Sequence, residues 1–207
     1  WPGSIVEFRR IVPMLTDPAR FGGDPADAFT IVAPSLPGYG FSFREGQKRV
    51  GISDMARMFV TLMKDVLGYQ KFGAQGGDWG SMITAALGSA IPEAVVGIHL
   101  TMPVVLRPDP DDQPLSRAER QAVLAHKAFM KAGTGYAREQ ATRPQTLGYG
   151  LVDSPVALCT WIVEKFWDWS ECAGDPCNAI RRDRLLDDVM LYWLPATGTS
   201  SIRLYWE

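Results

Sequence analysis

One short stretch near the middle of the chain constrains the fold more than any other. Residues 71–75 lead into Gly76-Gly77-Asp78-Trp79-Gly80, and apolar residues then recur at helical spacing over 82–87. This order predicts a strand, a sharp turn and a helix, with Asp78 at the tip of the turn. We expect Gly76, Gly77 and Gly80 to be needed there, because residues without a Cβ atom let the strand and the helix approach closely.

An aspartate at the tip of such a turn, a nucleophile elbow, has two interpretations. Aspartate carboxylates are ionised at neutral pH, so Asp78 could attack carbon without a base and form an ester. Hydrolysis of that ester would need a general base and N–H donors to the ester oxygen, and the backbone N–H of Trp79 is one candidate donor. Alternatively, Asp78 only caps the following helix. The pattern alone leaves both interpretations open.

The composition is that of an ordinary globular protein. Of the 207 residues, 46% are hydrophobic and 21% are charged, and the net charge is −2. No run rich in lysine or arginine occurs, so we do not expect nucleic acid or an anionic membrane as a partner. No apolar run approaches the roughly 20 residues that cross a bilayer, so we expect a soluble, cytoplasmic protein.

Neither the cysteines nor the acidic residues predict a metal site. The chain has three cysteines, an odd number, without a C-x-x-C pair. Carboxylates gather at Asp109, Asp111 and Asp112, but prolines surround them and no further ligands accompany them. A solvated acidic run is the expected interpretation, and we expect no metal and no other cofactor.

The first half of the chain predicts an α/β core. Ser4 and Glu7 have the spacing of a capping box at the start of a helix that reaches Leu15. Short apolar runs at 29–33 and 95–100 predict two further strands beside the one that precedes Asp78, and the first of them is expected to be buried. A helix from Ser53 to Leu67, ended by Gly68, lies between them in sequence. Strands that alternate with helices favour a parallel sheet with helices on both faces.

Beyond residue 106 the pattern becomes helical. Residues 107–114 form a linker rich in proline and charge, and helical spacing follows at 116–131, 154–169 and 183–193. A helical insertion after a core strand is expected to cover the carboxyl ends of the strands, where ligands bind in open α/β sheets. We therefore expect residues 1–106 to be part of an α/β core and residues 107–207 to be linker and lid.

Several motifs together resemble the α/β-hydrolase epoxide hydrolases. Three lie in the core: Trp1-Pro2-Gly3-Ser4, Pro34-Ser35-Leu36-Pro37-Gly38-Tyr39-Gly40-Phe41-Ser42 and Gly76-Gly77-Asp78-Trp79-Gly80-Ser81. The lid motifs narrow the resemblance to the microsomal and juvenile-hormone epoxide hydrolase branch, and they are Gly135-Tyr136, Ala141-Thr142-Arg143-Pro144-Gln145-Thr146, Asp153-Ser154-Pro155-Val156, Met190-Leu191-Tyr192-Trp193 and Arg203-Leu204-Tyr205. The resemblance covers essentially the whole chain and implies an α/β-hydrolase core, truncated at both ends, with an inserted helical lid.

The resemblance also implies roles for five residues. Asp78 matches the nucleophile that attacks an epoxide carbon. Trp1 and Trp79 match the two positions whose backbone N–H groups form the oxyanion hole. Tyr136 and Tyr205 match the lid tyrosines that hold and protonate the epoxide oxygen, a task suited to a phenol. Judged by local pattern alone, either tyrosine would be interpreted as a packing residue.

The sequence departs from the family pattern at the end of the chain. The general-base histidine of the family and the acid that orients it follow the lid, beyond Glu207. The chain has only His99 and His126, and neither follows an acid in the order nucleophile, acid, histidine. We interpret both as structural, and expect the 207 residues alone to form an ester without turnover. Attachment to a membrane through a segment before Trp1 remains open.

The sequence thus supports one main hypothesis and two alternatives. The main hypothesis is an enzyme that opens a small apolar epoxide to a vicinal diol with water, through an ester on Asp78. A haloalkane dehalogenase would use the same aspartate, with the Trp79 indole as a candidate donor to the halide. A hydrolase fold without activity that binds a hydrophobic ligand is the second alternative. The oligomeric state is not indicated.

Overall fold

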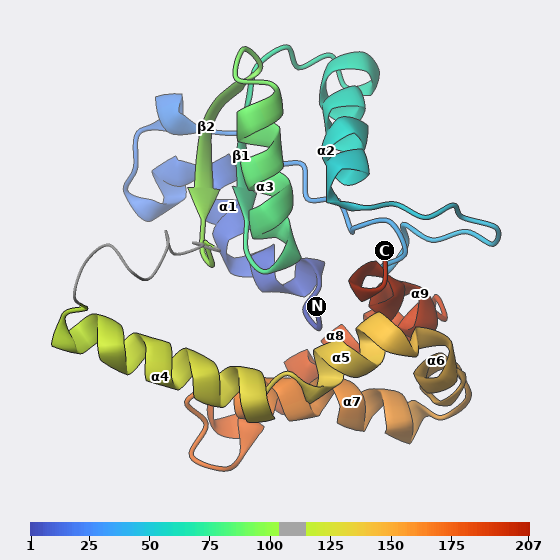
Figure 1. Ribbon diagram of the computed structural model, residues 1–207. Helices are drawn as coiled ribbons and strands as arrows, with labels where there is room; N and C mark the ends of the chain where they lie inside the picture. The colour runs from blue at the N-terminus through green and yellow to red at the C-terminus, as the bar shows by residue number, and fades with distance from the viewer. Residues whose placement is uncertain (104–114) are drawn as a thin grey trace. The chain divides into compact units, whose positions relative to one another are not determined.

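The structure is a computed structural model, and it describes residues 1–103 and 115–207. The helices and strands that Figure 1 labels are α1 (Ile11–Thr16), α2 (Ile52–Thr61), β1 (Phe72–Gly76), α3 (Trp79–Ala90), β2 (Val95–Leu100), α4 (Arg117–Ala132), α5 (Gly135–Thr142), α6 (Pro144–Asp153), α7 (Pro155–Asp168), α8 (Arg182–Trp193) and α9 (Gly198–Ile202). Short 3-10 helices span Ile5–Arg10, Pro18–Phe21, Pro25–Asp27, Pro176–Asn178 and Arg203–Tyr205, and a π-helical turn spans Leu62–Val66.

The chain divides into two compact units by its internal contacts. The first unit is Trp1–Lys48 with Pro144–Arg203, and the second unit is Arg49–Arg143 with Leu204–Glu207. Each unit therefore combines residues from both halves of the sequence. The division into a core at 1–106 and a lid at 107–207 stays a prediction.

The second unit contains the strand–turn–helix that the sequence predicts. Strands β1 and β2 pair in parallel, with Gly73 opposite Gly97 and Gly76 opposite Leu100. Parallel strands need a crossover connection, and α3 provides it and packs on both strands (Figure 1). Helix α2 packs on α3 in turn, with Met55 only 1% exposed. The predicted strand before Asp78, the strand at 95–100 and the α/β class are confirmed.

The boundaries of α2 differ slightly from the prediction. The helix begins at Ile52 rather than at Ser53. Gly51 is the N-cap residue, and its N–H donates to the Asp54 carboxylate at 3.2 Å. The chain leaves its helical path near Gly68, as predicted, where φ is +80°, in the left-handed region that favours glycine.

The first unit is mainly helical. Helix α6 packs on α7 and α9, α7 packs on α8, and α8 packs on the 3-10 helix Ile5–Arg10. Its most deeply buried apolar side chains are Leu151, Leu158, Ile162 and Ile202. These four residues come from α6, α7 and α9, so the core of this unit lies among the helices that follow Pro144.

The amino-terminal helix is shorter and tighter than predicted. A 3-10 helix at Ile5–Arg10 precedes α1, which ends at Thr16. Ser4 is the N-cap residue, as predicted, but its Oγ accepts from the N–H of Val6 at 3.2 Å rather than from that of Glu7. In the tighter 3-10 turn the N–H of Val6, rather than that of Glu7, reaches the Ser4 side chain. The predicted capping box between Ser4 and Glu7 therefore does not form.

The predicted strand at 29–33 is wrong. No strand in the described part of the chain pairs with this segment, and Phe29 is 60% exposed. The N–H of Phe29 instead donates to the carbonyl of Leu15 at 2.8 Å. A strand needs a neighbour that satisfies its backbone groups, and an apolar run by itself does not supply one. The described sheet therefore has two strands rather than three.

The three predicted lid helices are present as α4, α7 and α8. Two of these helices have serine N-caps, since the Ser116 and Ser154 side chains accept from the N–H groups of Glu119 and Ala157. Helices α5, α6 and α9 were not predicted, because they are short and glycines interrupt their apolar pattern. The predicted linker at 107–114, with its acidic run, lies outside the described residues.

No single helix within residues 1–103 or 115–207 has the length and apolar character needed to cross a membrane. Helices α6 and α7 pass that test only as a pair, by length and composition, and the chain bends by 115° between them.

Candidate active site

Asp78 occupies a strained position between β1 and α3. Its φ is 51° and its ψ is −128°, in a region that residues with a side chain rarely adopt. Such a conformation costs about 1–3 kcal/mol and persists only where the surrounding structure imposes it. The predicted sharp turn with Asp78 at its tip is therefore present, and the tip residue is strained.

Two glycines beside Asp78 permit this turn. A Cβ atom at Gly76 would lie 2.0 Å from the carbonyl oxygen of Gly80, and one at Gly77 would lie 2.4 Å from Oγ1 of Thr101. Gly80 is different, since a Cβ atom there would meet no atom of the described residues within 4 Å. The expectation holds for Gly76 and Gly77 and is wrong for Gly80, whose backbone rather than missing side chain makes the close contact.

The Asp78 side chain does not cap helix α3. The residue holds the N-cap position, but its carboxylate makes no capping hydrogen bond. The first turn is closed by the backbone instead, since the N–H of Ser81 donates to the carbonyl of Asp78 at 3.0 Å. The capping interpretation is therefore wrong.

Three aromatic side chains meet in the second unit, which also contains Asp78. The ring centroids of Trp79 and Tyr205 lie 4.9 Å apart at an interplanar angle of 86°. Those of Tyr136 and Tyr205 lie 5.8 Å apart at 76°. Both pairs have the edge-to-face geometry that aromatic quadrupoles favour. The structure thus brings both predicted tyrosines together with Trp79, from α5, the 3-10 helix Arg203–Tyr205 and α3.

The environment of Tyr136 links this aromatic group to Asp78. Burial raises the pKa of the Tyr136 phenol above its ordinary value of 10, a side-chain hydrogen bond with Tyr205 lowers it, and the negative charge of Asp78 raises it. A charge acts on a phenol in this way only over a short separation. The arrangement can present a carboxylate and two phenols to one substrate, with Tyr136 protonated at neutral pH.

Trp1, the fifth predicted site residue, belongs to the first unit. It is 8% exposed, and helix α8 contacts the turn that follows it. The Tyr192 hydroxyl donates to the carbonyl of Gly3 at 2.5 Å, and the Asp188 carboxyl has a side-chain hydrogen bond with Ser4. The turn that carries the Trp1 N–H is therefore held by two residues one helical turn apart on α8.

Burial strongly perturbs the pKa of the Asp188 carboxyl. It raises the pKa of this carboxyl to about 7; the hydrogen bond with Ser4 opposes the shift, the charge of Glu7 adds to it, and the amino group of Trp1 opposes it. Asp188 is 4% exposed, and its Oδ2 atom has no hydrogen-bond partner among the described residues. Sequence reasoning gave no role to Asp188 and named Tyr192 only as part of a lid motif. Their spacing of four on a helix with an apolar face was the one available signal.

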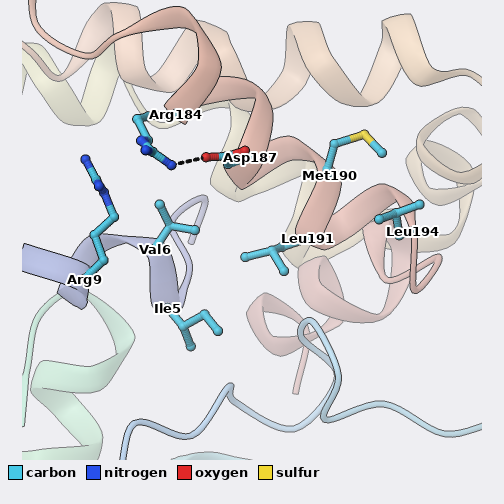
Figure 2. Close-up of a pocket in the computed structure, with 8 residues that line it drawn as sticks. All are labelled: Ile5, Val6, Arg9, Arg184, Asp187, Met190, Leu191 and Leu194. Carbon is cyan, nitrogen blue, oxygen red and sulfur yellow. Dashed lines mark hydrogen bonds and ion pairs between the residues drawn. The ribbon is translucent and has the colours of Figure 1, made fainter. Parts of the chain in front are cut away.

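An open groove of about 420 Å³ lies between α8 and the 3-10 helix Ile5–Arg10 (Figure 2). It is lined by Ile5, Val6, Arg9, Arg184, Asp187, Met190, Leu191 and Leu194. Arg184 and Asp187 form an ion pair at 2.5 Å along it. None of the five predicted site residues lines this groove.

His99 lies in β2, as predicted, but its side chain is exposed, and His126 is exposed on α4. Their interpretation as structural residues stays a prediction. Within residues 1–103 and 115–207, no group of three or more histidine, cysteine or acidic side chains could hold a metal ion.

Comparison with known proteins identifies a family. The family described as alpha/beta hydrolase fold matches residues 1–147. A protein of Stigmatella aurantiaca whose name includes epoxide hydrolase is 45% identical over 207 residues, which are 100% of this chain and 47% of that protein. Epoxide hydrolase 1 of Sus scrofa is 39% identical over 227 aligned residues, which cover 100% of this chain and 50% of that protein.

Solved structures give the same result. The structure of Aspergillus niger epoxide hydrolase has a TM-score of 0.82 and 37% identity, covering 100% of this chain and 52% of the other. The crystal structure of juvenile hormone epoxide hydrolase from the silkworm Bombyx mori has a TM-score of 0.79 and 32% identity, again covering 100% and 52%. The predicted resemblance is confirmed. The chain spans about half the length of the relatives that it matches.

Proposed function

The chain belongs to the alpha/beta hydrolase fold family, and from this premise we propose that the whole protein is an epoxide hydrolase that opens an apolar epoxide to a vicinal diol. One observation carries the proposal. A strained elbow aspartate, Asp78, lies in the same unit as the hydrogen-bonded pair Tyr136 and Tyr205, and its charge acts on Tyr136. A carboxylate nucleophile and two phenols are the groups that epoxide opening requires.

The first step forms an ester. A carboxylate oxygen of Asp78 attacks an epoxide carbon, a new C–O bond forms, and the bond from that carbon to the epoxide oxygen breaks. The departing oxygen takes a proton from the tyrosine pair. The raised pKa of Tyr136 supports this role, because the phenol stays protonated at neutral pH and can hold the oxygen by a hydrogen bond until charge develops on it.

The second step hydrolyses the ester. Water adds to the carbonyl carbon of the Asp78 ester, and the diol leaves with the ester oxygen that Asp78 contributed. The Trp79 N–H at the start of α3 suits the task of stabilising the oxyanion, since the first N–H groups of a helix lack intrahelical partners. The resemblance assigns the second donor to the Trp1 N–H. We expect the general-base histidine and its acid partner outside these 207 residues.

The alternatives fit the contacts less well. A haloalkane dehalogenase has no use for two phenols, whereas here both lie in one aromatic group with Trp79. A protein that only binds a hydrophobic ligand does not need a strained acid. That alternative would be supported if ligand binding survived Asp78→Asn in a protein that forms no product.

We further propose that the protein is soluble and cytoplasmic and acts on small apolar epoxides without a metal or another cofactor. The low net charge of −2 and the ordinary composition support this. Membrane attachment through a segment before Trp1 is compatible with the same chemistry.

Isotope labelling tests the proposal. In a single turnover of the full-length protein with styrene oxide in H₂¹⁸O, the ester route takes the new diol oxygen from the Asp78 carboxylate. The first-turnover diol should therefore contain no label, and ¹⁸O should appear in the Asp78 peptide. A label in the first-turnover diol would show direct attack by water and would contradict the proposal.

A further inference from the structure

We propose that the side chain of Trp79 is a positioning residue for Tyr205, so that the helix which follows the nucleophile also fixes the proton donors. This role is separate from the backbone N–H of Trp79 and rests on the proposed function. The observation behind it is the edge-to-face contact of the two rings, 4.9 Å apart at 86°.

Trp79 is suited to this task by its place in the chain. It is the first residue of α3 and directly follows Asp78, whose backbone is fixed by the close approach of Gly76 to Gly80. An indole attached at this point therefore has little freedom relative to the nucleophile. Any ring packed against it has its position defined relative to the elbow rather than to a distant element.

Tyr205, in contrast, depends on its neighbours. It ends a 3-10 helix of three residues, and such short helices have few internal hydrogen bonds to fix a side chain. The next two residues are anchored near the start of α2. The Arg49 guanidinium lies 4.0 Å from the ring centroid of Trp206, and the N–H of Val50 donates to Oε2 of Glu207 at 2.8 Å. These contacts hold the backbone after Tyr205, while Trp79 contacts the ring itself.

The effect of Trp79 should extend to the second tyrosine. Tyr205 contacts Tyr136 edge to face at 5.8 Å and shares a hydrogen bond with it. A continuous chain of contacts therefore runs from Trp79 through Tyr205 to Tyr136. If Tyr205 loses its support from the indole, its hydroxyl loses its placement relative to the epoxide oxygen, the hydrogen bond through which it reaches Tyr136 is weakened, and ester formation slows.

The alternative is that Trp79 only fills space and stabilises the fold. The two roles differ in whether the effect of the indole passes through the Tyr205 hydroxyl. A purely structural residue should slow the reaction by the same factor whether that hydroxyl is present or not. A positioning residue should have no effect once the hydroxyl that it positions has been removed.

A double-mutant cycle in the full-length protein separates these roles. The rate constant of Asp78 ester formation from styrene oxide is measured in single turnover for Trp79→Leu, Tyr205→Phe and the double variant. We expect Trp79→Leu alone to slow ester formation about tenfold, the upper worth of an aromatic pair. In the Tyr205→Phe background it should slow ester formation less than about twofold, because the two effects are coupled.

Two further variants act as controls. Trp79→Phe keeps an aromatic ring and should recover the rate to within about threefold of the wild type. Trp167→Leu makes the same replacement at an exposed tryptophan of α7 and should leave the rate unchanged. Thermal melts identify any variant that has lost its fold, and Trp79→Phe keeps the test decisive if Trp79→Leu does not fold.

The outcomes are distinguishable. An equal slowing by Trp79→Leu in both backgrounds would overturn the positioning role of Trp79 and leave the proposed function intact. If the wild-type protein forms diol but never an ester on Asp78, the proposed function itself fails, and this inference fails with it.

Discussion

The phenol rings of Tyr136 and Tyr205 pack edge to face, 5.8 Å apart at 76°, although the two residues lie far apart in the sequence. The two side chains share a hydrogen bond, and the charge of Asp78 acts on Tyr136. Two phenols beside a carboxylate have a clear chemical use, because one group attacks carbon while the others receive the oxygen that leaves.

Removal of either hydroxyl should slow epoxide opening. Tyr136→Phe and Tyr205→Phe should each lower the rate of diol formation by the full-length protein about a hundredfold, the lower range for loss of a general acid. Tyr149→Phe is the matched control, because Tyr149 is 67% exposed on α6, and it should react normally. Near-normal turnover in both site variants would contradict the assignment and favour a dehalogenase.

The titration of Tyr136 should respond to Asp78. Burial and the Asp78 charge raise the pKa of the phenol, so it should ionise above pH 10 in the wild-type protein. Asp78→Asn removes the charge, so the phenol should ionise at lower pH in that variant. Ultraviolet difference titration of tyrosinate, with Tyr136→Phe subtracted to isolate the residue, measures the shift. An unchanged titration would show that the two groups do not interact.

The buried carboxyl of Asp188 should make stability depend on pH. Its pKa is raised from 3.8 to about 7 in the folded protein, so folding favours the protonated form. The stabilisation is complete below pH 4 and is lost as the pH rises towards 7. At the linkage value of 1.36 kcal/mol per pKa unit, the loss is about 4 kcal/mol.

Chemical unfolding at pH 5 and pH 8 checks this prediction. Asp188→Asn should lose less stability than the wild type over that interval, because it removes the titrating group. Asp183→Asn, at an exposed position of the same helix, should behave as the wild type. Equal losses of stability in the wild type and Asp188→Asn would contradict the prediction.

Gly76 and Gly80 should differ sharply in how well they tolerate replacement by alanine. Gly76→Ala places a Cβ atom 2.0 Å from the Gly80 carbonyl, so the backbone must shift, at a cost of about 1–3 kcal/mol or more. Gly80→Ala meets no such contact in the described residues and should change the free energy of unfolding by less than about 1 kcal/mol. Denaturant unfolding compares the two variants. A larger loss for Gly80→Ala would contradict the observed geometry.

The parts of the fold with a strong local signal were predicted. The turn at Asp78 and helices α4 and α7 have small residues or serine caps at their boundaries, so local sequence is enough to place them. The strand at 29–33 was wrong, because an apolar run does not specify a partner strand. Helices α5, α6 and α9 were missed because they are short, and tertiary packing rather than propensity stabilises such helices.

The candidate site, like the fold, could be predicted from the sequence only in part. Local pattern predicted the sharp turn with Asp78 at its tip, whereas Tyr136 and Tyr205 were identified only through a family resemblance. Their contact joins residues far apart in the sequence, which periodicity cannot reveal. The bond from Tyr192 to Gly3 was missed for the same reason.

The most direct test of the central claim is a covalent adduct on Asp78. The full-length protein is mixed with excess styrene oxide, quenched with acid within one turnover, digested and analysed by mass spectrometry. We predict that the peptide containing Asp78 gains the mass of one epoxide and that fragmentation locates the gain on Asp78. A protein that forms diol while Asp78 remains unmodified at every quench time would contradict the account.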